Sequence, residues 1–95
     1  MDRNEARTVL ATHLASFRRR SYADLVTLIG DVQVAEISGP SGAQYQIEVE
    51  VMWDSPDQRT NIRVLGAIDD GRFLSSLTPL GDSFILSPAG RFVGE

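Results

Sequence analysis

Cysteine, lysine and long apolar runs are all missing from this sequence. Without cysteine the chain has no disulfide, no thiolate metal site and no cysteine nucleophile. All nine cationic residues are arginine, which excludes Schiff-base chemistry on lysine and the lysine of a phosphate-binding loop. No stretch approaches the roughly 18 apolar residues of a membrane span. The first ten residues carry charges of both signs, unlike a secretory signal, so we expect a cytoplasmic protein.

Length and charge narrow the possible classes further. The 95 residues are few enough that residues 1–95 should form one domain. Residues 1–20 carry five arginines against two acids, whereas residues 21–95 carry four arginines against eleven acids. Because most of the chain is acidic, it offers a poor general surface for nucleic acid, and we expect no nucleic-acid partner.

An amphipathic helix is predicted over residues 4–17. Its apolar residues recur at steps of three and four and make a single stripe: Ala6, Val9, Leu10, Leu14 and Phe17. Asn4 is placed to cap the first turn. Ser21 and Asp24 have the spacing of a capping box and predict a second helical segment, which Gly30 is suited to terminate.

From residue 31 onwards the apolar period changes from 3.6 to 2, which predicts strands. The clearest strand is 43–53, in which every second residue is apolar or aromatic: Ala43, Tyr45, Ile47, Val49, Val51 and Trp53. Further strands are predicted at 32–38, 61–68, 72–78 and 83–87, and 91–95 is a candidate for a short terminal strand. Turns or loops are expected at 39–42, 54–60, 69–71, 79–82 and 88–90.

This element order predicts an α+β domain. One or two N-terminal helices, within residues 4–29, should pack on a four- to five-stranded antiparallel meander sheet within residues 32–93. The arrangement resembles the cystatin-like and NTF2-like architectures in element order, without a shared residue motif. Such folds carry unrelated activities, so the resemblance implies a fold and no function.

Strand register identifies the first candidate site, on the outer face of the sheet. Matching the apolar faces of 43–53 and 61–68 places Val51 opposite Val64. The other face then carries an apolar island with a charged rim: Met52, Leu65 and Ala67, surrounded by Glu48, Glu50 and Arg63. Apolar patches with charged rims are typical of contact sites. We therefore expect a non-enzymatic interaction module that binds a protein partner or forms a homodimer. The alternative is that the C-terminal Phe92 and Val93 cover this face.

A competing hypothesis is a small-ligand site, or a weak enzyme, in a pocket between the helices and the concave sheet face. Its candidate lining residues are Tyr45, Trp53 and His13. No nucleophile or carboxylate stands at a spacing that would pair it with His13, so a boundary histidine at the edge of the helical stripe explains it as well. A tryptophan at the end of a core face is usually a lid on the core, which is the first explanation of Trp53. One histidine without clustered carboxylates makes no metal site, and we expect no metal and no cofactor.

The remaining charged groups have ordinary structural explanations. Glu48 and Glu50 share one face of a strand, as a catalytic carboxylate pair would, but that face is expected to be solvated. The cluster Arg18–Arg20 follows the first helix, where cations complement the helix dipole. Aspartates at 54, 57, 69 and 70 are typical of turns and lack the spacing of a calcium loop.

Overall fold

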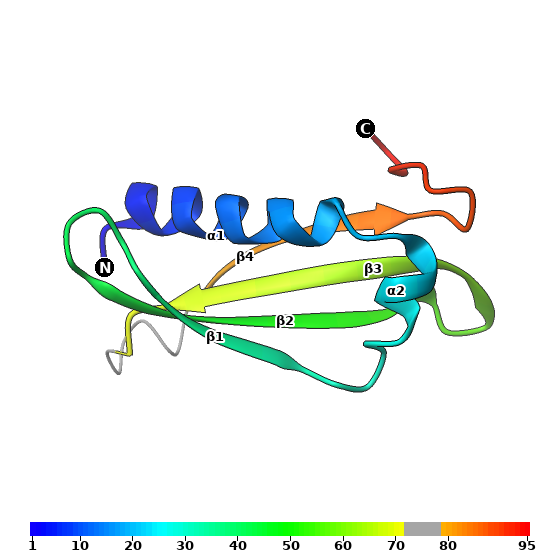
Figure 1. Cartoon of the computed structure of the whole chain (residues 1–95), viewed down its shortest axis with the longest axis horizontal. Helices are drawn as coiled ribbons and strands as arrows, with labels where there is room; N and C mark the ends of the chain where they lie inside the picture. Colours follow the sequence, from blue (N-terminus) through cyan, green and yellow to red (C-terminus); the bar gives the residue numbers. More distant parts are fainter. Residues whose placement is uncertain (72–78) are drawn as a thin grey trace.

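The computed structural model describes residues 1–71 and 79–95, which form two layers (Figure 1). One layer is a four-stranded antiparallel sheet in the order β1-β2-β3-β4. The other consists of helices α1 (Arg3–Arg18) and α2 (Tyr22–Val26), both on the same face of the sheet. The predicted α+β class, with N-terminal helices on an antiparallel meander, is confirmed.

Helix α1 buries the predicted stripe without exception: Ala6, Val9, Leu10, Leu14 and Phe17 are all buried. Each such side chain contributes about 1.5–3 kcal/mol relative to an exposed position, so this stripe is what holds the helix on the sheet. The predicted cap is wrong by two residues. The side chain of Asp2, not of Asn4, accepts the hydrogen bond from the Glu5 amide, at 3.0 Å.

The second helix starts where predicted and ends early. The hydroxyl of Ser21 accepts from the Asp24 amide at 3.1 Å, as an N-cap should. The helix proper ends at Val26, and a turn leads to Gly30, which has a positive φ of 86°. That conformation favours glycine and redirects the chain towards the sheet.

The strands are β1 (Gln33–Ser38), β2 (Gln44–Ser55), β3 (Gln58–Asp69) and β4 (Leu80–Leu86). The long loop expected at 54–60 does not exist, because Ser55 pairs directly with Gln58 and the strands run on to a two-residue turn. The turn expected at 79–82 is also wrong, since β4 already begins at Leu80. The strand predicted over 72–78 lies outside the described residues.

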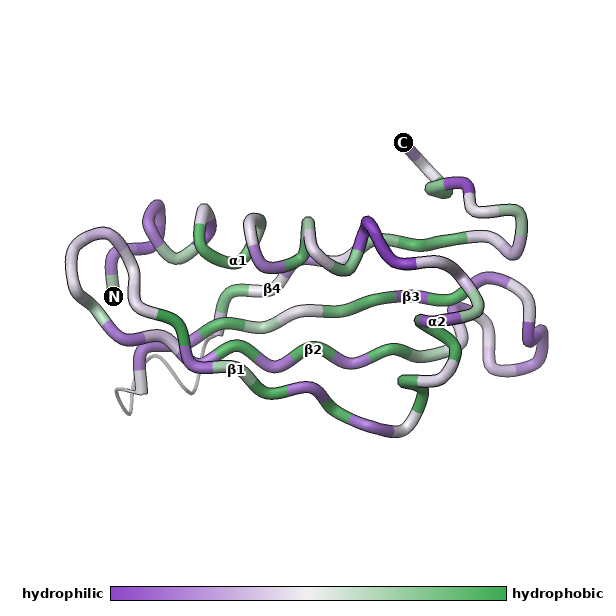
Figure 2. The backbone as a smooth tube through the Cα atoms, viewed as in Figure 1, coloured by the Kyte–Doolittle hydropathy of each residue, from purple (hydrophilic) through white to green (hydrophobic). Residues whose placement is uncertain are grey.

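The register predicted between β2 and β3 is confirmed. Val51 lies opposite Val64, Met52 opposite Arg63, Glu50 opposite Leu65 and Glu48 opposite Ala67. Along β2 the hydropathy alternates from residue to residue, which can be followed in Figure 2. The sheet therefore has an inner face under the helices and a separate outer face.

Helix α1 packs tightly on β3 at Gly66. A Cβ atom at this position would lie 3.0 Å from a methyl group of Leu10 and 3.1 Å from one of Leu14. Glycine is therefore favoured here by the limited space between α1 and the strand rather than by its backbone angles.

The C-terminal segment after β4 turns back beside it. Phe92 forms an isolated antiparallel bridge with Leu86, and the Val93 amide donates to the Ile85 carbonyl at 2.9 Å. The candidate terminal strand at 91–95 is thus reduced to this short contact with the edge of β4.

Candidate functional site

The outer face of the sheet carries the apolar island that the register predicts, enlarged by one residue. Met52, Leu65 and Ala67 lie on this face, and Ile85 joins them from β4, opposite Arg63. We call these four residues the outer island. Leu65 is 39% exposed, an unusual exposure for a leucine in the middle of a central strand. Sequence reasoning missed Ile85 because its face depends on the register of β4, although the alternation of Ser83 and Ile85 with Phe84 and Leu86 carries that signal.

Acidic side chains lie on one side of the outer island, on β1 and β2. Glu48 and Glu50 are exposed beside it, and Glu36 of β1 extends the acidic area. The cation on this face, Arg63, is already paired: its Nε and Nη2 atoms donate to Asp54 Oδ1 at 3.1 and 3.0 Å. Among the described residues no cation pairs with the three glutamates. The outer face therefore carries an apolar patch centred on β3 and an acidic area on the side of β1 and β2, and this acidic area is what we call the acidic rim.

The C-terminal segment does not cover the outer island. The ring of Phe92 packs edge-on against the buried Phe84, with centroids 5.7 Å apart, on the helix side of the sheet. The guanidinium of Arg18 lies 4.8 Å from both ring centroids. Val93 lies along the edge of β4 and is 41% exposed. The alternative in which Phe92 and Val93 shield the outer face is therefore wrong.

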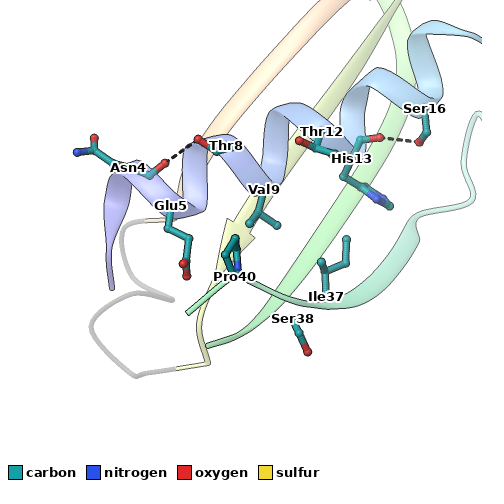
Figure 3. A pocket seen from close by; sticks show the side chains of 10 residues that line it. All are labelled: Asn4, Glu5, Thr8, Val9, Thr12, His13, Ser16, Ile37, Ser38 and Pro40. Carbon is teal, nitrogen blue, oxygen red and sulfur yellow. Dashed lines mark hydrogen bonds between the residues drawn. The ribbon is translucent and has the colours of Figure 1, made fainter. Parts of the chain in front are cut away.

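A groove of about 660 Å³ opens on the other face, between α1 and β1 (Figure 3). It exists because α1 lies over β3 and β4, which leaves β1 only half covered. Its walls combine apolar and small polar side chains: Asn4, Glu5, Thr8, Val9, Thr12, His13, Ser16, Ile37, Ser38 and Pro40.

His13 lies in this groove as a half-buried side chain. Its ring contacts the edge of Phe17, with centroids 5.5 Å apart, and burial lowers the pKa of the imidazole. No described side chain hydrogen-bonds to the imidazole. Within residues 1–71 and 79–95 there is also no group of three or more metal-ligating His, Cys, Asp or Glu side chains. The geometry of His13 is that of a boundary residue, without a nucleophile or a metal shell.

Tyr45 belongs to a polar network that closes one end of the groove. Its buried hydroxyl donates to Glu5 Oε1 at 2.7 Å, and Ser41 donates to the same carboxylate through its hydroxyl at 2.8 Å and its amide at 3.0 Å. These donors lower the pKa of Glu5, and the Glu5 carboxylate raises the pKa of Tyr45 to about 12. A side chain at Gly39 would collide with both, because its Cβ would lie 2.6 Å from Glu5 Oε1. The network therefore fixes the β1–β2 turn to the start of α1.

The three pocket candidates do not meet in one cavity. Tyr45 and Trp53 are eight residues apart on β2, which separates them by about 26 Å. Trp53 is half-buried against the core, opposite Ile62, near the β2–β3 turn. His13 lines the groove, and Tyr45 reaches it only through Glu5.

The basic cluster is largely occupied within the chain. Arg18 makes a two-pronged ion pair with Glu95, at 2.7 and 2.9 Å, and Arg20 pairs with Asp24 at 2.6 Å. Arg20 also lies over the ring of Phe17. These contacts match the structural explanation of the cluster.

Known proteins offer no match. No protein-family model, curated protein or solved structure is similar to the chain at a significant level. In the described part of the chain no helix is long and apolar enough to cross a membrane. The functional argument therefore rests on the geometry of the two surfaces, the outer island and the groove.

Proposed function

We propose that this protein is a non-catalytic interaction module and that the outer island with its acidic rim is its contact surface. The observation that carries the proposal is the exposure of this face: no described segment covers Met52, Leu65, Ala67 and Ile85. A sheet whose outer side only met water would present polar side chains at these positions.

An interface of standard size would have to use nearly the whole outer face. The Cα extents of 39 × 22 × 22 Å limit the face to roughly 850 Å² (39 × 22), and a standard interface buries about 800 Å² on each partner. A second copy of the chain is the simplest occupant. A different protein is the other, and the three unpaired glutamates favour one with basic residues around an apolar centre.

Salt distinguishes these two occupants. Two copies bring like charges together, so their association should strengthen as salt screens the repulsion. A basic partner should bind more weakly at high salt. The solution mass can be measured by light scattering across a range of protein and salt concentrations, for the wild type and for Leu65→Glu.

If the occupant is a second copy, we expect a dimer whose proportion rises with the salt concentration. The substitution Leu65→Glu should dissociate this dimer. The matched control is Ala11→Glu, which adds the same charge to an exposed position of α1. A dimer that Leu65→Glu leaves intact would contradict the proposed surface. If the protein is a monomer under all conditions, a second copy is excluded as the occupant and a different protein is the candidate that is left.

Small-ligand binding between the helices and the sheet has weaker support. The space under α1 is filled by Leu10, Leu14 and Phe17, all at most 6% exposed. The 660 Å³ groove lies to the side of this filled region and is open along α1.

A further inference from the structure

The two edges of the sheet differ in whether their outward backbone groups are hydrogen-bonded. The edge of β4 is partly covered, because Val93 donates to Ile85 and the segment after Leu86 turns back along the strand. β1 lies at the opposite edge of the sheet. Among the described residues no backbone group bonds to its outer side. A free edge is a template for another strand, and proteins usually block it with proline, lysine or a bulge. β1 has none of these.

The direction of the free backbone groups follows from the β1–β2 turn. The Gly39 amide donates to the Ala43 carbonyl at 2.8 Å, which makes these two residues a hydrogen-bonded pair. Such pairs alternate along an antiparallel ladder, so Ile37 and every second residue before it bond to β2. The intervening residues Val34, Glu36 and Ser38 therefore direct their N–H and C=O groups to the free edge.

The groove lies on the inner side of this same edge. Ile37 and Ser38 of β1 form one wall, and Val9, Thr12 and His13 of α1 form the other (Figure 3). A strand added to β1 would alternate between two environments. Its inward side chains would enter the groove, and its outward side chains would lie next to Glu36 on the outer face.

Charge and polarity define the added strand. Opposite Ile37 the groove is lined by Val9, Thr12 and His13, which suits small apolar side chains, and the carboxylate of Glu5 is already bound by Tyr45 and Ser41. On the outer side the added strand would lie beside Val34, which is 59% exposed, Glu36 and Ser38. Glu36 has no described cationic partner and suits an arginine or lysine opposite it. A second copy of β1 fits less well. In antiparallel self-pairing, residues that point to the edge must face one another, so Glu36 would meet Glu36, Val34 or Ser38 of the copy, and only the last of these avoids placing the carboxylate against a like charge or an apolar side chain.

We propose that the free edge of β1 and the adjoining groove bind an extended peptide segment in which apolar and basic residues alternate. The segment adds a fifth strand beside β1, places its apolar residues against Val9, His13 and Ile37, and pairs its basic residues with Glu36. This site shares Glu36 with the acidic area of the outer face but contains none of the four residues of the outer island, so variants at Leu65 and at Val34 test the two surfaces separately.

Hydrogen exchange tests the strand addition directly. The probe is a blocked seven-residue peptide that alternates valine and arginine, and its control replaces every arginine with glutamate. With saturating arginine peptide, exchange of the Val34, Glu36 and Ser38 amides should slow by at least about tenfold, while the Ala35 and Ile37 amides, already bonded to β2, should change little. The glutamate peptide should give no protection. Unchanged exchange at the three edge amides, or protection centred on Leu65, would overturn the proposal.

Two substitutions check the mechanism. Val34→Pro removes an N–H group that the fold does not use, a place where edge strands tolerate proline. It should weaken binding of the arginine peptide by about fivefold relative to Val34→Ala. Glu36→Arg should reverse the preference, so that the glutamate peptide binds better than the arginine peptide.

Three results would contradict the peptide site. One is arginine-peptide affinity that neither Val34→Pro nor Glu36→Arg alters. Another is protection of the edge amides that rises with protein concentration alone, because that would assign the edge to a second copy. The third is equal binding of both peptides by wild-type protein, which would remove the role of Glu36. Circular dichroism of each variant confirms that the fold is retained.

Discussion

The close approach of α1 to β3 predicts a large effect from adding one methyl group, in the variant Gly66→Ala. The new Cβ would lie 3.0 Å from Leu10 Cδ1 and 3.1 and 3.3 Å from the two methyl carbons of Leu14. Both leucines are at most 3% exposed, so their methyl groups cannot move aside into solvent. Overpacking of this kind costs about 1–3 kcal/mol.

A second effect acts in the opposite direction. Replacing a glycine of ordinary φ by alanine restricts the unfolded chain and stabilises the fold by about 0.4–1 kcal/mol. The net loss for Gly66→Ala should therefore be about 0–2.6 kcal/mol, and its stability should lie about 1–3 kcal/mol below that of a glycine-to-alanine variant that has the backbone gain alone. For a domain of this size, each kcal/mol lowers the melting temperature by about 4–8 °C.

The matched control is Gly81→Ala, on β4 opposite Ala67. A Cβ at Gly81 would meet only the Gly66 carbonyl oxygen at 3.5 Å, an ordinary contact. This variant should show the backbone gain alone. Urea denaturation and thermal melts followed by circular dichroism measure both variants. If Gly66→Ala were as stable as Gly81→Ala, the packing of α1 on β3 would be looser than the structure requires.

Two further perturbations probe the contacts that fix the ends of the chain. The raised pKa of Tyr45 means that the Glu5–Tyr45 bond stabilises the fold fully below about pH 10, and that this contribution is lost as the pH rises towards about 12. Ultraviolet titration of a Tyr22→Phe variant, which leaves Tyr45 as the titrating tyrosine, should give a midpoint near 12, and a midpoint near 10 would show that the bond is absent in solution. Arg18→Ala should free the C-terminal segment, so that the Val93 amide exchanges about two- to fivefold faster while the rest of the sheet is unchanged. Uniform acceleration across the sheet would show instead that Arg18 supports the whole core.

Most of the fold could be predicted from the spacing of apolar residues along the sequence. The stripe along α1 and the alternation of β2 each arise from one face of an element meeting the core, so local sequence is sufficient to reveal them. The same alternation placed Met52 opposite Arg63 and Glu50 opposite Leu65, because one buried face on each strand leaves a single register.

The errors have physical causes as well. Polar residues at 54–60 resemble a loop, yet β2 continues to Ser55 and β3 begins at Gln58, because the backbone pairing of the two strands does not require apolar side chains at these exposed positions. Leu80 and Gly81 resemble a turn after Pro79, but the side chain of Leu80 is buried in the core and β4 already begins at this residue. The hydrogen bond between Glu5 and Tyr45 joins residues 40 apart in the sequence, and no local pattern predicts it. The groove depends on where α1 lies across the sheet, which the order of elements does not determine.

Site-specific photo-cross-linking in cells that express the protein tests the contact surface most directly. A photo-reactive phenylalanine derivative is placed at Leu65, in the outer island, and in parallel at Ala11, on the solvent side of α1. We expect a discrete adduct from position 65 and only background from position 11. If the partner is basic, the adduct should be lost when Glu48 and Glu50 are both changed to arginine. An adduct of twice the monomer mass identifies a second copy, and any other mass identifies a different protein. Equal background at both positions would contradict the assignment of the outer face as the contact surface.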